Sequence, residues 1–463
     1  MLKPKPRQSG GERMMIMACN QRVTGVCAQA EGFSTLAEGN SSHAEGYFTT
    51  ASGPAAHSEG SNTTAGGDAA HAEGLESTTS APAAHAEGYR STASGNAAHA
   101  EGTTTIASGS AAHAEGDQTI ASGNAAHAEG WMTVASLDTA HAEGAFTESR
   151  GESAHAEGLY SQAIGHASHA EGYLTVANSD TAHAEGSQTA ATGVAAHSEG
   201  FSTTASGNTA HAEGIRTVAD AETAHAEGLN TQTGGYAGAH IMGRFGTAQE
   251  AYSWFIANGT SEQNTGIGAK WLASTGSMYV DGSFVPSGAD YAELFETVDG
   301  TPIAPGYFVT TKGRKIQKAT SGSYVAGVTS ASPAIIGDSA EMRWHGKYKT
   351  DKWGAVEMQE VILPAEVDNR GKVIVPERRE MQPVLNPDYN PELAYTPRRL
   401  RPEWVAVGML GKLLVRDDGT CEVDGFCAPS DDGIATKAER GFRVLERTSE
   451  DQILILFVSG QVL

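Results

Sequence analysis

Residues 85–98 read His-Ala-Glu-Gly-Tyr-Arg-Ser-Thr-Ala-Ser-Gly-Asn-Ala-Ala, and residues 99–112 repeat the pattern as His-Ala-Glu-Gly-Thr-Thr-Thr-Ile-Ala-Ser-Gly-Ser-Ala-Ala. The tetrapeptide His-Ala-Glu-Gly, or His-Ser-Glu-Gly, returns every 14 residues from His43 to His225 without an insertion or deletion. A short fixed period is typical of a solenoid, in which each repeat buries its face against its neighbours. A degenerate copy begins at Gln29, and we interpret it as the cap of the stack.

Each repeat is predicted to form strand, turn, strand and turn. Side chains alternate across a strand, so Ala98 and Ala100 share one face while His99 and Glu101 share the other. We expect the alanine face to point inward, together with the Ser or Thr that follows each motif glycine by three residues. A second glycine in many repeats, such as Gly95, indicates a tight turn.

An interior of Ala, Ser and Thr is thin, and this predicts association of several chains. Apolar burial contributes only roughly 25 cal/mol per Å², against the entropy lost when so much backbone is ordered. The repeat, as in residues 94–102, resembles the head repeats of trimeric autotransporter adhesins over roughly residues 23–235. That resemblance implies a left-handed parallel β-roll, trimeric about the axis of the rod, although His and Glu replace the family's more usual small and aliphatic residues.

The His and Glu side chains of the tetrapeptide allow three interpretations. Imidazole and carboxylate both bind divalent transition ions, so they could form a row of metal sites. We favour His of one chain bonded to Glu of another, which would fix the register of a trimer, and we assign no metal site. A solvated face is the third alternative. The residue after each motif glycine varies freely, which predicts exposed turn tips. The aromatic ones are candidate receptor contacts: Phe33, Tyr47, Tyr89, Trp131, Tyr173 and Phe201.

The charge of the chain excludes several classes of partner. The formal net charge is −24, and no lysine occurs between Lys5 and Lys270, so we expect no binding to nucleic acid or anionic lipid. The 4 cysteines show neither a zinc spacing nor a dense disulfide framework, which suits assembly in the reducing bacterial cytoplasm. We expect neither a secretory signal nor a membrane span, because the apolar runs are too short.

The composition changes after Gly228, where His240 arrives one residue late. Large side chains such as Trp254, Phe255 and Trp271 then predict a compact neck over residues 236–289. The segment 286–293 follows and reads Pro-Ser-Gly-Ala-Asp-Tyr-Ala-Glu, with Asp290 and Glu293 three positions apart. Two acids at a domain entry are candidates for acid–base chemistry, or they belong to a turn without catalysis.

From about His240 to Leu463 the chain resembles the intramolecular chaperone autoprocessing domain of phage neck appendages and tail spikes, a glutamic-type self-cleaving peptidase. The Asp-Tyr-Ala-Glu core at residues 290–293 and the stretch 335–341 carry this resemblance. It implies that residues 290–463 align three chains and then cut themselves off. The implied scissile bond is Ala289–Asp290, and the implied catalytic acids are Asp290 and Glu293.

The chemistry is reasonable for these residue types. One carboxylate can activate water while a second carboxylic acid protonates the leaving amine, provided that their pKa values differ. The best-known phage member of the family has Ser before the aspartate, whereas this chain has Ala289. A hydroxyl route is therefore closed here, which leaves three alternatives: water activated by Glu293, direct attack by Asp290, or no cleavage.

Cleavage is expected to need no cofactor, and the residues of any cofactor site are left unassigned. The resemblance implies a role for ATP in release of the chaperone, but the chain lacks a Gly-rich Lys-Ser/Thr phosphate loop. A nucleotide site would have to use C-terminal arginines, for which we favour an ordinary solvated cluster: Arg378, Arg379, Arg398, Arg399 and Arg401.

Together these features predict a mainly β, homotrimeric phage or prophage fibre or appendage protein. We expect an N-terminal arm at residues 1–22 that contacts the virion or another fibre protein, a shaft at 23–235, a neck at 236–289 and a chaperone at 290–463. Assembly would take place in the bacterial cytoplasm, and the mature form would belong to the virion. The alternative is a bacterial surface adhesin or another non-catalytic binding module with a β-roll head.

Overall fold

The computed structural model describes residues 19–340, 346–367, 371, 373–375, 377–390, 392 and 394–458, so most of the expected N-terminal arm lies outside the described residues. Within these ranges the regular elements are β-strands and one short 3-10 helix, η1 (Arg398–Leu400). No helix in this part of the chain is long and apolar enough to cross a membrane. Contacts divide the chain into two compact units, residues 1–282 with 367–375 and residues 283–366 with 376–463.

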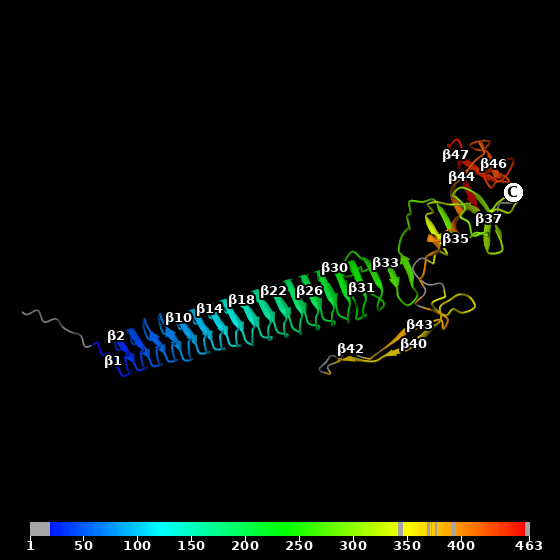
Figure 1. The fold of residues 1–463 in the computed structure, drawn as a ribbon. Helices are drawn as coiled ribbons and strands as arrows, with labels where there is room; N and C mark the ends of the chain where they lie inside the picture. Colours follow the sequence, from blue (N-terminus) through cyan, green and yellow to red (C-terminus); the bar gives the residue numbers. More distant parts are fainter. Residues whose placement is uncertain are drawn as a thin grey trace, which may run out of the picture. The chain divides into compact units, whose positions relative to one another are not determined.

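The first unit is a parallel β-solenoid, coloured blue to green in Figure 1. Each turn contributes a strand over the His-Ala-Glu-Gly tetrapeptide and a two-residue strand, as in β12 (His99–Thr103) and β13 (Ile106–Ala107). Each strand pairs in parallel with its equivalents one turn away, so His99 lies between His85 and His113. The predicted solenoid is confirmed, and its register repeats the sequence period.

The other strands of these turns have equivalent bounds. Those over the tetrapeptide are β2 (Gln29–Phe33), β4 (His43–Tyr47), β6 (His57–Ser58), β8 (His71–Ala72), β10 (His85–Tyr89), β14 (His113–Asp117), β16 (His127–Trp131), β18 (His141–Ala145), β20 (His155–Leu159), β22 (His169–Tyr173), β24 (His183–Ser187), β26 (His197–Phe201) and β28 (His211–Ile215). The short ones are β1 (Arg22–Val23), β3 (Leu36–Ala37), β5 (Thr50–Ala51), β7 (Thr64–Ala65), β9 (Thr78–Thr79), β11 (Thr92–Ala93), β15 (Ile120–Ala121), β17 (Val134–Ala135), β19 (Glu148–Ser149), β21 (Gln162–Ala163), β23 (Val176–Ala177), β25 (Ala190–Ala191), β27 (Thr204–Ala205) and β29 (Val218–Ala219).

The interior of the solenoid consists of small side chains, as the alternation predicts. Ala100, Thr105 and Ala107 of one turn are all fully buried, whereas His99 and Glu101 are half-buried on the outer face. The motif glycines allow the turns to approach one another. Gly102 has a φ of +113°, and a Cβ there would lie 2.1 Å from the carbonyl oxygen of Gly116 in the next turn. Glycine therefore recurs because the backbone leaves no room for a side chain.

The solenoid continues beyond residue 235, where the sequence analysis ended it. β30 (His225–Gln232), β31 (His240–Thr247) and β32 (Trp254–Asn258) stack in parallel, and His240 pairs with His225 despite the extra residue. Gly234 and Gly235 take positive φ values in the intervening loop, where the insertion is accommodated. The interior then widens from Ala226 to Ile241 and Phe255, which are fully buried, or nearly so, and close the end of the stack. The antiparallel strands β33 (Ile267–Leu272) and β34 (Ser277–Val280) complete this unit.

The second unit contains a mainly antiparallel sheet with the order β37-β36-β38-β44-β48-β47-β45-β46, to which β35 and β39 are added. Its core includes Phe308, Phe442, Ile455 and Phe457. The strands are β35 (Asp290–Glu296), β36 (Phe308–Lys312), β37 (Lys315–Lys318), β38 (Gly327–Thr329), β39 (Ile335–Gly337), β44 (Trp404–Arg416), β45 (Phe426–Pro429), β46 (Ala435–Ala438), β47 (Phe442–Ser449) and β48 (Gln452–Val458). A further antiparallel pairing joins β40 (Met358–Leu363) to β43 (Arg378–Pro383). A separate two-stranded sheet joins β41 (Glu366–Val367) to β42 (Val373–Val375), and residues 367–375 belong to the first unit.

The small interior predicts intolerance of larger side chains. Replacing Ala100 by leucine should lower the free energy of unfolding by about 1–3 kcal/mol, because the solenoid turns cannot separate locally to admit the added carbons. Thr103→Leu places the same side chain at an exposed position of the same strand and serves as the control. Thermal unfolding followed by circular dichroism measures both variants; equal melting temperatures would contradict the interior assigned here.

Candidate functional site

The segment with the two candidate acids enters the second unit as strand β35. This strand pairs antiparallel with β44, where Asp290 lies opposite Gly411. On its other side β35 pairs in parallel with β39, where Glu293 lies opposite Gly337. The two stretches that carry the resemblance, 290–293 and 335–337, are therefore neighbouring strands of one sheet.

The backbone around the Ala289–Asp290 peptide is held on both sides. The Ala289 carbonyl oxygen accepts a hydrogen bond of 3.4 Å from the backbone N–H of Lys412, and the Asp290 carbonyl oxygen accepts one of 2.9 Å from that of Ala334. Gly411 packs directly on this peptide: its φ is +118°, and a Cβ there would lie 2.2 Å from the Ala289 oxygen. A backbone donor thus contacts the oxygen on which negative charge would develop during hydrolysis.

The carboxyl group of Asp290 is buried in an unusual environment. The residue is 6% exposed, and its Oδ2 has no hydrogen-bond partner among the described residues. Gly408 leaves the space for this oxygen, since a Cβ on Gly408 would lie 2.9 Å from Oδ2. A cavity of about 550 Å³ lies beside it, and Lys412 and Arg416 are among its lining residues. An unpartnered buried carboxyl group costs stability, which marks it as a candidate reactive group.

Glu293 has different surroundings. Its Oε1 accepts a hydrogen bond of 2.6 Å from the hydroxyl of Tyr291, and this bond raises the pKa of Tyr291. Gly337 provides the room for this pair, because a Cβ there would lie 2.7 Å from the Tyr291 hydroxyl oxygen. Tyr291 is 36% exposed, so the pair faces accessible surface of its unit.

The two acids lie on opposite faces of β35. Side chains alternate along a strand, and the burial pattern follows this alternation: Asp290 and Ala292 are buried, whereas Tyr291 and Glu293 are not. The sequence analysis treated Asp290 and Glu293 as partners in one reaction. Within a single chain, the strand places their carboxyl groups on different sides of the sheet.

A comparison with known protein families finds one family that is similar to the C-terminal part of the chain. Residues 247–452 match the family model Peptidase_G2, described as an IMC autoproteolytic cleavage domain. The resemblance inferred from the sequence is confirmed by this match, and Ala289, Asp290 and Glu293 all lie within the matched residues.

Several phage proteins are similar to part of the chain. The pre-neck appendage protein of Bacillus phage B103 is 33% identical over 198 residues, which cover 40% of this chain and 22% of the relative. That of Bacillus phage phi29 is 32% identical over 161 residues, 35% of this chain and 17% of the relative. The chain therefore spans about a fifth of the length of the curated relatives that it matches.

Two solved structures of a protein of bacteriophage phi29 are also similar to the chain. The crystal structure of the phi29 gene product 12 C-terminal fragment is 30% identical, with a TM-score of 0.30, covering 36% of this chain and 99% of the fragment. The pre-mature gene product 12 is 17% identical, with a TM-score of 0.39, covering 93% of this chain and 39% of the other.

Four of the five C-terminal arginines singled out by sequence lie beside acids. Arg378 pairs with Glu380 at 2.8 Å and Arg379 with Glu360 at 3.4 Å. Arg401 lies 3.8 Å from Glu403. Arg398 pairs with Asp338 and is 8% exposed. Its guanidinium lies 4.1 Å from the centre of the Trp404 ring.

The structure also places residues that the sequence analysis missed beside the Ala289–Asp290 peptide and Glu293. Gly411 and the N–H of Lys412 contact the Ala289 carbonyl from more than 100 residues further along the chain, and Tyr291 orients Glu293. Only Tyr291 could have been found from the sequence, because it shares a face with Glu293 in any strand through this segment.

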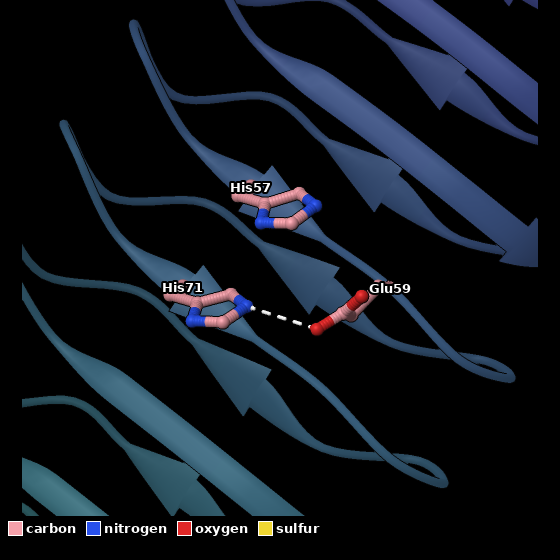
Figure 2. Close-up of side chains that lie close together, drawn as sticks. All are labelled: His57, Glu59 and His71. Carbon is pink, nitrogen blue, oxygen red and sulfur yellow. Dashed lines mark ion pairs between the residues drawn. The ribbon is translucent and has the colours of Figure 1, made fainter.

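The solenoid carries a second concentration of ionisable groups, here called the His–Glu face: the imidazoles and carboxylates of the tetrapeptide strands. Figure 2 shows the rings of His57 and His71 stacked in parallel, with the carboxylate of Glu59 directed at Nε2 of His71. Ring centres are 4.8 Å apart in this pair. Burial lowers the pKa of His71, and the neighbouring imidazole adds to the effect.

The contact of Gly411 with the Ala289 oxygen predicts the behaviour of a conservative variant. Gly411→Ala should slow self-cleavage by roughly tenfold or more, because the new Cβ displaces the peptide from its backbone donor. Gly419→Ala is the control, since Gly419 has a φ of +86° but open space around its Cβ position. The fraction of full-length chain is measured on denaturing gels over time; equal rates for both variants would contradict this role of Gly411.

Proposed function

We propose that this chain is part of a homotrimeric phage or prophage appendage protein whose C-terminal domain cuts the chain at Ala289–Asp290. The observation that carries this assignment is the buried, unpartnered carboxyl group of Asp290 at that bond, in a domain of the autoproteolytic family. The hydrogen bond from Lys412 to the Ala289 carbonyl supports it, since it is placed to stabilise the oxyanion. The names of the relatives support the appendage role.

The reaction is hydrolysis of one peptide bond. Water adds to the Ala289 carbonyl carbon, and its proton passes to a carboxylate acting as general base. The C–N bond then breaks as the Asp290 nitrogen receives a proton from a carboxylic acid. The products are a carboxylate at Ala289 and an amino terminus at Asp290, and no cofactor takes part.

We assign Asp290 the position beside the leaving nitrogen, and Glu293 the activation of water on a neighbouring chain. The opposite faces of β35 support this division, because they separate the carboxyl group of Glu293 from that of Asp290 within one chain. The accessibility of the Tyr291–Glu293 pair supports contact with another chain. Cleavage would then wait for assembly, and an unassembled chain would keep its chaperone.

Features of the solenoid support a trimer. Its alanine interior buries little apolar surface per turn. At its C-terminal end, an apolar hollow of about 400 Å³ is lined by large side chains, several of them exposed. Those that are at least 39% exposed are Met242, Trp254, Ile256, Trp271 and Met278. A patch of this kind is typical of a surface that another chain covers.

In this proposal the solenoid is the mature shaft. Assembly takes place in the bacterial cytoplasm, the N-terminal part contacts the virion, and the exposed aromatic side chains at the turns, such as Trp131 and Phe201, contact a host receptor. We also propose that ATP assists release of the cleaved domain, and this part of the proposal rests on the family resemblance alone.

Substitution of either acid tests the cleavage chemistry. Asp290→Asn and Glu293→Gln should each slow cleavage by roughly 100-fold or more, because each removes a proton acceptor or donor without changing side-chain volume. Denaturing gels and the mass of the C-terminal product measure the outcome, and the wild-type product should begin at Asp290. A product with another first residue, or an uncut wild type, would contradict the proposal; Glu296→Gln in the same strand is the control.

Mixed trimers test whether Glu293 acts on a neighbouring chain. A chain with Glu293→Gln keeps an intact scissile bond, and a differently tagged chain with Asp290→Asn keeps Glu293. Co-expression should restore cleavage of the Glu293→Gln chain, with none when either is expressed alone. If that chain stays intact in purified mixed trimers, Glu293 does not act between chains.

A further inference from the structure

The imidazoles of the His–Glu face lack partners for their Nε2 atoms. From His43 to His225, and again at His240, Nε2 is buried without a hydrogen-bond partner among the described residues. An unsatisfied buried nitrogen costs stability, and here the cost recurs at every turn. The solenoid supplies no lysine as an alternative partner for the carboxylates, because none occurs between Lys5 and Lys270.

The distances between these imidazoles and the glutamates are informative. The separations of Nε2 from the nearest carboxylate oxygens range from 3.4 Å at His141–Glu143 to 4.0 Å at His99–Glu101. A hydrogen bond between nitrogen and oxygen is about 2.7–3.2 Å long. Two ligand atoms bonded to one zinc ion at about 2.1 Å, in a tetrahedral arrangement, lie roughly 3.4 Å apart. The observed separations thus match the edge of a coordination shell better than they match a hydrogen bond.

Two adjacent turns together contribute three such atoms. Nε2 of His71 lies 3.5 Å from Oε1 of Glu59 and 3.8 Å from Oε2 of Glu73. The glutamates follow Ser58 and Ala72, which pair in register between adjacent turns, so both carboxylates lie on the same face as His71. Two carboxylates beside one imidazole provide a place for a cation.

We propose that the His–Glu face binds divalent transition-metal ions of the zinc type, with Glu59, His71 and Glu73 forming the best-defined site. The imidazole contributes Nε2, each carboxylate contributes one oxygen, and water completes a four-coordinate shell. Three protein ligands and one open position form a common arrangement for zinc.

Adjacent imidazoles cannot share one ion as they stand. Stacked ring centres lie 4.8 Å apart along this part of the rod, whereas two bonds of about 2.1 Å span at most roughly 4.2 Å. Each ion is therefore bound by one imidazole and by glutamates of its own turn and the preceding one. Glu185 illustrates how the arrangement repeats, with one oxygen 4.0 Å from His183 and the other 3.8 Å from His197.

This proposal departs from the interpretation favoured on sequence, in which interchain His–Glu bonds set the trimer register and no metal takes part. Spacing alone could not separate the two, whereas the distances and the unpartnered Nε2 atoms favour ions. Binding and cleavage use different residues in different units, so failure of one proposal leaves the other standing.

Metal content of the full chain tests the proposal. The protein is treated with a chelator, dialysed against micromolar ZnCl2 and analysed for bound zinc. We expect several ions per chain, and the combined substitutions His57→Gln, His71→Gln, His85→Gln and His99→Gln should remove about four of them. Glutamine suits this position, because Gln29 already occupies it in the first turn and pairs in register with His43.

A second pair of variants guards against loss of folding. Glu59→Gln with Glu73→Gln should remove about one or two ions. Glu148→Gln with Glu152→Gln removes the same amount of charge at positions outside the His–Glu face and should leave binding unchanged. Bound Co²⁺ should show the intense visible absorption of a four-coordinate site. Fewer than one zinc ion per chain in the wild type, or equal loss in both pairs of glutamate variants, would overturn the proposal.

Discussion

The in-register parallel stacking of the 14-residue turns is the constraint on which the rest of the rod depends. Equivalent residues of adjacent turns pair in register, and backbone N–H groups donate to carbonyl oxygens of the next turn, as His85 does to Ala98. One choice of side chain is therefore repeated along the whole stack. A position with no room for a Cβ, such as Gly102, must then be glycine in every turn. An interior that admits only a methyl group, as at Ala100, must likewise stay small.

This constraint explains how much of the fold the sequence predicts. The period, the strand alternation and the glycines are local signals, and they predict the solenoid and its alanine interior. The continuation through β31 and β32 is not visible in the same way, because Ile241 and Phe255 replace alanine and one residue is inserted. Backbone pairing tolerates that change, since the larger side chains lie where the stack ends and the interior widens.

The cleavage segment combines a local motif, which the sequence reveals, with contacts from distant residues, which it does not. The acids Asp290 and Glu293 were found from a local motif, and their opposite faces follow from alternation once the segment is known to be a strand. The contacts of Gly411 and Lys412 with the Ala289 carbonyl depend on the pairing of β35 with β44, which lies more than 100 residues away in sequence. No local pattern contains that pairing, so the donor and the glycine could only be found in the structure.

The same stacking creates an electrostatic problem that one chain cannot solve alone. An antiparallel pair can place opposite charges across from each other, but identical turns place each glutamate beside another glutamate. Two unit charges about 5 Å apart repel by roughly 1 kcal/mol in water and about 3 kcal/mol near a protein surface. A rod with a carboxylate in each turn and few basic residues therefore needs positive charge or shared protons along the whole face. A hydrogen bond to Glu59 raises the pKa of Glu73 to about 7, and the charges of neighbouring glutamates add to the effect. Burial lowers the pKa of His71, so its imidazole offers an electron pair but no charge at neutral pH. A divalent cation supplies the missing charge and the missing partner for Nε2 together, which a hydrogen bond from another neutral group cannot do.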